Sequence, residues 1–182
     1  MSFHHQKIIL LAINVVAGGS VIASYIHGLL AHPDTRALLW GSVPQSLLPL
    51  YNVSMITATI GYIIFTSYII FFIDPDETTL AGNFSYSLFY WLYAVILVFS
   101  ALWMPLTFMM LDKPSAGLWL AIRCTLGVVG LGSIGILAAI FTLQPGGPVW
   151  AQRSALIGCS FFCVQTAVLD ALVWTAYFPS RL

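Results

Sequence analysis

The sequence predicts an all-α integral membrane protein, a bundle of five transmembrane helices in a single membrane domain spanning residues 1–182. Of its 182 residues, 60% are hydrophobic and only 7% are charged, too few to cover the surface of a soluble globule. Five apolar segments reach the roughly 20 residues that a helix needs to cross a bilayer. Because lipid offers the backbone no hydrogen bonds, helices are the expected spanning elements.

The predicted helices are separated by stretches rich in Pro, Gly and Asp, which are typical of turns. The first apolar run is long enough to be a retained helix rather than a cleaved signal peptide. The longest connection covers residues 31–49, between the first two helices. An odd number of crossings places the termini on opposite sides. We call the end with residues 31–49 and the C-terminus the far end, and the other the near end. The expected spans are about residues 7–30, 50–73, 85–111, 116–142 and 151–178.

The charge balance excludes one class of partner and weakly orients the chain. Six Lys and Arg are matched by six Asp and Glu, so the basic excess of a nucleic-acid-binding protein is absent. Membrane lipids and a hydrophobic small molecule are the expected partners. Outside the spans or at their ends, the far end carries Arg36, Lys113 and Arg181, and the near end carries Lys7 and Arg153. By the positive-inside rule this difference favours a cytoplasmic C-terminus.

No metal site, cofactor or catalytic constellation is predicted. Cys124, Cys159 and Cys163 lie inside apolar runs without CxxC spacing, so we interpret them as small apolar side chains. His27 and His32 lie five residues apart but have no third metal ligand within reach in the sequence. A Ser-His-Asp order, paired catalytic carboxylates and a histidine-rich box are all absent from the sequence.

Two ionisable residues lie well inside the predicted spans. Arg123 follows Ser115 by eight residues and Asp170 precedes Phe178 by eight, so both lie about 12 Å from the far end. Each costs about 2.5 to 3.5 kcal/mol at a helix centre on insertion scales, which calls for a partner. Helices joined by a short turn are usually neighbours, so the two could form an ion pair. Alternatively, Arg123 extends to the interface and Thr166, one turn earlier, satisfies Asp170.

Polar and aromatic residues collect at the same depth and predict a ligand pocket beneath residues 31–49. On the fifth helix Thr166, Asp170 and Trp174 share one face with Gln165 beside it, and Tyr25 lies near the end of the first helix. Aromatic concavities with few polar groups are typical small-molecule sites. The alternative is that each Trp or Tyr anchors a helix end at the interface. The predicted lining residues are Trp40, as a lid, with Tyr51, Asn52, Ser100, Trp103, Arg123, Thr166, Asp170 and Trp174.

Two segments rich in small residues predict close helix packing. GVVGLGSIG, residues 127–135, contains four glycines, and GGSVIAS, residues 18–24, contains two. Neither is a phosphate-binding loop, because no strand precedes it and no Lys-Ser/Thr follows it. Small residues let helix backbones approach closely in lipid. We therefore expect these faces to pack within the bundle or to form a homodimer.

Two further segments resemble a known family. FSALWMPLTF, residues 99–108, and TAVLDALVW, residues 166–174, are similar to patterns in the third and fifth helices of the translocator proteins, also called tryptophan-rich sensory proteins (TspO/MBR). Trp103 and Pro105 match the third-helix pattern, with Ser100 in place of an Asn. The fifth-helix pattern Thr-Ala-x-Leu-Asn-x-x-Ile-Trp is matched except that Asp170 replaces its Asn and Val173 its Ile.

The resemblance implies a fold and a function. It implies a five-helix bundle in which the first long loop covers a pocket for porphyrins, sterols or related hydrophobic ligands, with dimerisation possible. The sequence departs from the family in that loop, where the Trp and Pro signatures are reduced to Trp40 with Pro33, Pro44 and Pro49. The second helix resembles the family only loosely.

The leading hypothesis is therefore a membrane receptor or transporter-like protein for a hydrophobic small ligand, without a bound cofactor. One alternative is a membrane-embedded enzyme acting on a lipid, sterol or isoprenoid, with Asp170 as acid or base. A second alternative is a non-catalytic subunit of a membrane complex, packed through its small-residue faces.

Overall fold

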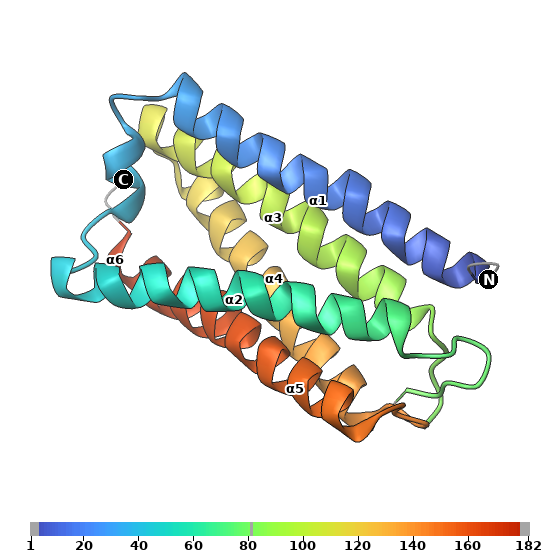
Figure 1. The fold of residues 1–182 in the computed structure, drawn as a ribbon. Helices are drawn as coiled ribbons and strands as arrows, with labels where there is room; N and C mark the ends of the chain where they lie inside the picture. The colour runs from blue at the N-terminus through green and yellow to red at the C-terminus, as the bar shows by residue number, and fades with distance from the viewer. Residues whose placement is uncertain (1–3, 81, 179–182) are drawn as a thin grey trace.

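The computed structural model describes residues 4–80 and 82–178. It confirms the all-α class, with five helices long and apolar enough to cross a membrane (Figure 1). The fifth is composite, because its second half is a π-helix. The elements are α1 (His5–Ala31), α2 (Leu48–Phe71), α3 (Leu88–Asp112), α4 (Ala116–Thr142), α5 (Val149–Cys163), the π-helix η3 (Val164–Trp174) and α6 (Thr175–Tyr177).

The helix ends differ from the predicted bounds by a few residues, for local reasons. α2 begins at Leu48 because Pro49 occupies its first turn, where the missing N–H costs nothing. α3 begins at Leu88 rather than residue 85, since a turn in which Leu88 N–H donates to Ser85 O precedes it. α4 begins as predicted, and the Ser115 side chain caps it by accepting from the N–H of Leu118 at 3.2 Å.

The helices form a ring in the order α1, α3, α4, α5, α2. Figure 1 shows α1 lying along α3 and α2 lying along α5. The α1–α2 seam is the weakest join of the ring, although the Tyr62 hydroxyl donates to Asn14 Oδ1 across it. In α1 only Leu10 and Gly28 are buried. The first helix therefore rests mainly on α3 and presents most of its surface to lipid.

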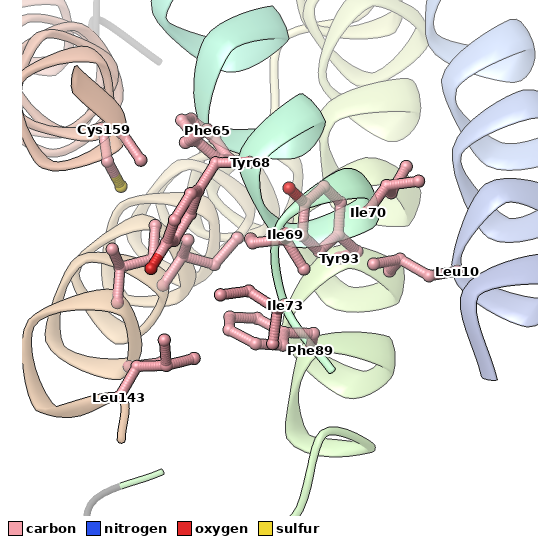
Figure 2. Close-up of a cluster of buried hydrophobic side chains, with 14 of the residues drawn as sticks. Leu10, Phe65, Tyr68, Ile69, Ile70, Ile73, Phe89, Tyr93, Leu143 and Cys159 are labelled. Atoms are coloured by element: carbon pink, nitrogen blue, oxygen red, sulfur yellow. The ribbon is translucent and has the colours of Figure 1, made fainter. Parts of the chain in front are cut away.

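Close packing, rather than exclusion of water, holds the near half of the bundle together. Phe65 and Tyr68 of α2 and Phe89 and Tyr93 of α3 are buried in one cluster with Cys159 of α5 (Figure 2). Lipid tails are as apolar as these side chains, so their association depends on complementary contact. Ring centroids 5.3 to 6.2 Å apart within the aromatic cluster are consistent with such contact.

Glycines set the closest approaches between helices. A Cβ placed on Gly61 of α2 would overlap the carbonyl oxygen of Gly158 on α5, so these two backbones touch. A Cβ on Gly130 would lie 2.9 Å from Ala167 Cα of η3. The predicted packing role of the 127–135 segment therefore operates within the chain. The homodimer stays a prediction. Four helix glycines have open space where a Cβ would be added, and they are Gly18, Gly19, Gly117 and Gly127.

Backbone bonds between connections close the near end. Thr79 N–H donates to Gln144 O at 2.8 Å and Gln144 N–H returns a bond to Thr79 O at 3.0 Å. These bonds join the α2–α3 connection to the α4–α5 connection. An ion pair between His4 Nε2 and Asp76 Oδ2 at 3.0 Å ties the start of α1 to the same region.

The far end is covered by the predicted long connection, which folds into two 3-10 turns, Arg36–Trp40 and Gln45–Leu47. It is bonded to the end of the fifth helix. The Trp174 indole N–H donates to Leu39 O at 2.9 Å, and Ser42 N–H donates to Tyr177 O at 2.9 Å. Arg181, one of the far-end charges used to predict orientation, lies outside the described residues, so the orientation stays a prediction.

Candidate functional site

Asp170 lies on the π-helix η3 and is held by a neighbour on the same helix. Gln165 Nε2 donates to Asp170 Oδ1 at 2.8 Å. Backbone hydrogen bonds in a π-helix run from i to i+5, so residues five apart lie one turn apart. The prediction that Thr166 would satisfy Asp170 assumed α-helical spacing and is wrong. The wider turn brings Gln165 to the carboxylate instead.

Two tyrosines from other helices approach the same carboxylate. Asp170 interacts electrostatically with the hydroxyls of Tyr25 on α1 and Tyr51 on α2. The Tyr51 hydroxyl donates to Leu169 O at 2.8 Å, which fixes α2 against η3 next to Asp170. The Asp170 side chain is partly accessible. It therefore lies between α1, α2 and η3 and is not fully enclosed by the protein.

The predicted ion pair between Arg123 and Asp170 is absent from the structure. Arg123 is exposed on the outside of α4, with its guanidinium carbon 6.0 Å from the centre of the Trp119 ring. Its neighbours Ile122 and Leu126 supply the buried face of α4 at this level. Equal depth therefore did not bring Arg123 and Asp170 together, because Arg123 points away from the bundle axis. Of the predicted lining residues, Arg123 stays apart from the Asp170 cluster.

Aromatic rings pack against the two tyrosines that interact with Asp170. Trp103 of α3 contacts Tyr25 with ring centroids 5.7 Å apart, and contacts Trp174 at 5.6 Å, both edge to face. Trp40 of the far-end connection meets Tyr51 at 5.5 Å in the same geometry. Edge-to-face contacts of this kind fix ring orientations. Four of the predicted residues, Trp40, Tyr51, Trp103 and Trp174, are therefore brought together near Asp170.

Two polar atoms in this cluster have no hydrogen-bond partner among the described residues. They are the indole nitrogen Nε1 of Trp103 and the amide oxygen Oε1 of Gln165, both buried. A buried polar group without a partner costs about 1 to 3 kcal/mol, and each such group needs an explanation. A donor and an acceptor therefore lie unused in one aromatic-walled region.

The remaining predicted residues have other positions. Thr166 is buried and donates toward Ser133 Oγ at 2.8 Å and Phe162 O at 2.9 Å, so it joins η3 to α4. Asn52 is exposed on α2. Ser100 is half-buried on α3, one turn before Trp103. None of these three residues carries one of the buried polar atoms without a partner.

Gln165 and Tyr25 belong to the site although the predicted lining set omits them. The sequence predicts both at the depth of Asp170, but α-helical spacing puts Gln165 beside the face that carries Asp170. The five-residue spacing from Gln165 to Asp170 is the signal that could have identified it. Tyr25 could not be oriented from sequence, since the rotation of α1 about its axis follows from its packing on α3.

Two hollows lie away from Asp170. One of about 250 Å³ lies between α1 and α3, lined by His27, His32, Phe108 and Asp112 among others. A wider one of about 400 Å³ lies on the outside of α4 and α5. Among the described residues, no group of three or more His, Cys, Asp or Glu could hold a metal ion. Neither hollow has Asp170 in its lining.

Together, the fold and the site define a five-helix membrane protein with a carboxylate-centred aromatic cluster inside its far half. Comparison of the chain with protein-family profiles, with curated proteins and with solved structures found no match. The resemblance to the TspO/MBR family stays a prediction that rests on the two motifs.

Proposed function

We propose that this protein is a membrane receptor or transporter-like protein that binds a small hydrophobic ligand around Asp170, inside the far half of the bundle. The observation that carries the proposal is the pair of unpaired polar atoms, Trp103 Nε1 and Gln165 Oε1, beside a partly accessible carboxylate. Aromatic walls with a few convergent polar groups are the usual form of a small-molecule site.

A ligand with one hydrogen-bond acceptor and one donor would satisfy both atoms. Trp103 Nε1 would donate to the acceptor, and Gln165 Oε1 would accept from the donor. Each bond formed in place of an unpaired group would recover part of the cost of burying it. The rings of Trp103, Trp174, Tyr25 and Tyr51 supply the apolar contact area.

The π-helix gives independent support. Such helices are rare and occur frequently at functional sites. Here η3 carries Gln165, Asp170 and Trp174, and its wider turn makes the Gln165–Asp170 contact. An α-helix over the same residues would place Gln165 away from Asp170.

The two TspO/MBR-like motifs favour porphyrins or sterols as the ligand class. Trp103 belongs to the first motif, and Asp170 and Trp174 belong to the second. The connection that carries Trp40 would act as the lid. Its bonds to the fifth helix, Trp174 Nε1 to Leu39 O and Ser42 N to Tyr177 O, are those that opening would break.

The proposal is tested by titrating the purified protein in lipid nanodiscs with protoporphyrin IX and, separately, with cholesterol, while following tryptophan fluorescence. We expect saturable binding in the wild type and a dissociation constant raised about three- to tenfold in Trp103→Phe, since that change removes the unpaired donor. Trp91→Phe is the matched control, because Trp91 is 72% exposed near the other end of α3. A flat response to both ligands would count against the proposal.

A further inference from the structure

Asp170 has no cationic partner among the described residues. The ion pair between His4 and Asp76, at the near end, is the one such pair within residues 4–80 and 82–178. Arg123, the cation at the depth of Asp170, is exposed and lies over Trp119. A carboxylate on a membrane-spanning helix is costly unless a countercharge or other polar partners offset it. No cationic side chain among the described residues therefore pairs with the Asp170 carboxylate.

The aromatic groups around Asp170 suit a cation. Tyr25, Tyr51, Trp103 and Trp174 come from four different elements. Asp170 interacts electrostatically with the two tyrosines, and Trp103 packs edge to face on Tyr25 and Trp174. The face of an aromatic ring attracts an ammonium group, most strongly where water is excluded. Such aromatic surroundings and a carboxylate together form a recognition pattern for organic cations.

The hydrogen-bonding groups also favour an ammonium group. The Gln165 amide donates its N–H to Asp170 Oδ1, which leaves Gln165 Oε1 as a free acceptor. Asp170 Oδ2 accepts no hydrogen bond from the described residues. A protonated amine offers up to three donors for these oxygens. A carboxylate ligand would instead meet two oxygen acceptors and a like charge.

We propose that the Asp170 site selects hydrophobic amines in their protonated form, with the ammonium group on Asp170 and Gln165 Oε1. This inference rests on the proposed function, because it concerns ligand binding at the same site, and it replaces the porphyrin and sterol classes that the two motifs favour with amines. It goes further in predicting discrimination by charge: amine over neutral alcohol, and alcohol over carboxylate.

Three probes of similar size test this discrimination: 1-adamantanemethylamine, 1-adamantanemethanol and 1-adamantanecarboxylate. Binding is measured by calorimetry to the whole chain in nanodiscs of zwitterionic lipid, with empty nanodiscs subtracted. We expect the amine to bind about tenfold more tightly than the alcohol, from a charge-assisted hydrogen bond and aromatic contact. The carboxylate should bind most weakly of the three.

Variants locate the effect. In Asp170→Asn the amine-to-alcohol ratio should fall to within about twofold of one, whereas Asp170→Glu should retain a preference for the amine. Asp112→Asn is the matched control, since it removes an exposed carboxylate at the end of α3. That control should leave the ratio unchanged. The wild-type comparison of three probes needs no variant, so the test does not depend on how well a variant folds.

The outcomes separate the two proposals. Equal binding of amine and alcohol, or a preference that survives in Asp170→Asn, overturns the charge discrimination and leaves ligand binding standing. Binding of the alcohol or carboxylate alone does the same. If none of the three probes binds but protoporphyrin IX or cholesterol does, only the amine inference fails. If none of the five compounds binds, both fail.

Discussion

Arg123 and Asp170 show what depth along a helix does and does not determine. Their distances from the far end follow from counting residues, and those depths placed them at one level. Whether two side chains meet also depends on how each helix is rotated about its axis. In α4 the buried face at this level is supplied by Ile122 and Leu126, so Arg123 falls outside it. Its stem can follow the apolar surface while its charge lies over Trp119.

A double-mutant cycle tests whether the Arg123 and Asp170 side chains are independent of each other. We expect Arg123→Gln to change the free energy of unfolding by less than about 0.5 kcal/mol, as a surface substitution. Because the two side chains do not touch, its effect should add to that of Asp170→Asn within about 0.5 kcal/mol. Unfolding by denaturant in detergent measures both changes. A coupling energy well above 1 kcal/mol would show that the two residues pair.

At the scale of elements, the sequence predicted helices well and their internal geometry poorly. Apolar runs of sufficient length identify spans because the bilayer core imposes that length. The π-helix was not predicted, since spacing was interpreted with 3.6 residues per turn throughout. That single assumption set Gln165 beside the functional face and assigned Thr166 to Asp170. Thr166 instead bonds to Ser133 of α4.

For the long connection, too, the sequence predicts the position but not the detailed contacts. Its length and its position over the site were predicted from residues 31–49. Its attachment was not, because the bond from Trp174 Nε1 to Leu39 O joins residues 135 apart in the chain. Trp40, proposed as a lid, does lie over Tyr51. Sequence reasoning placed this residue in the correct region because the loop can only cover the end of the bundle where it begins and ends.

The α2–α5 contact carries a testable cost at the scale of elements. Gly61→Ala should destabilise the protein by about 2 kcal/mol or more, because the added methyl group would overlap the backbone of Gly158 and force α2 and α5 apart. Gly18→Ala is the control, as a Cβ there meets open space. The control should be neutral or stabilising. Equal unfolding midpoints for the two variants would contradict the close α2–α5 approach.

At the scale of the whole molecule, five crossings place the two ends on opposite sides. The acidic connection that contains Glu77 lies at the near end and the α3–α4 turn that contains Lys113 lies at the far end. The sequence alone led to the same arrangement, because it follows from the number of spans. The charge distribution adds the prediction that the far end is cytoplasmic.

Cysteine labelling in intact cells tests whether the two ends lie on opposite sides of the membrane and whether the far end is cytoplasmic. In a Cys124→Ala background, we expect an impermeant maleimide to label Glu77→Cys from outside and to leave Lys113→Cys unlabelled until the cells are permeabilised. Cys159 and Cys163 are buried and should stay unlabelled. Labelling of both positions from one side would exclude five crossings. Labelling of Lys113→Cys alone from outside would reverse the orientation.

The packing of α1 on α3 has a consequence for biosynthesis. α1 ends at Ala31 and α3 ends at Asp112, so about 80 residues are made between the completion of each. At about 5 to 20 residues per second, this delay is on the order of ten seconds. During that time α1 and α2 share the bilayer with only a weak contact between them. α1 therefore waits in lipid, stable as a single span, until α3 arrives to hold it.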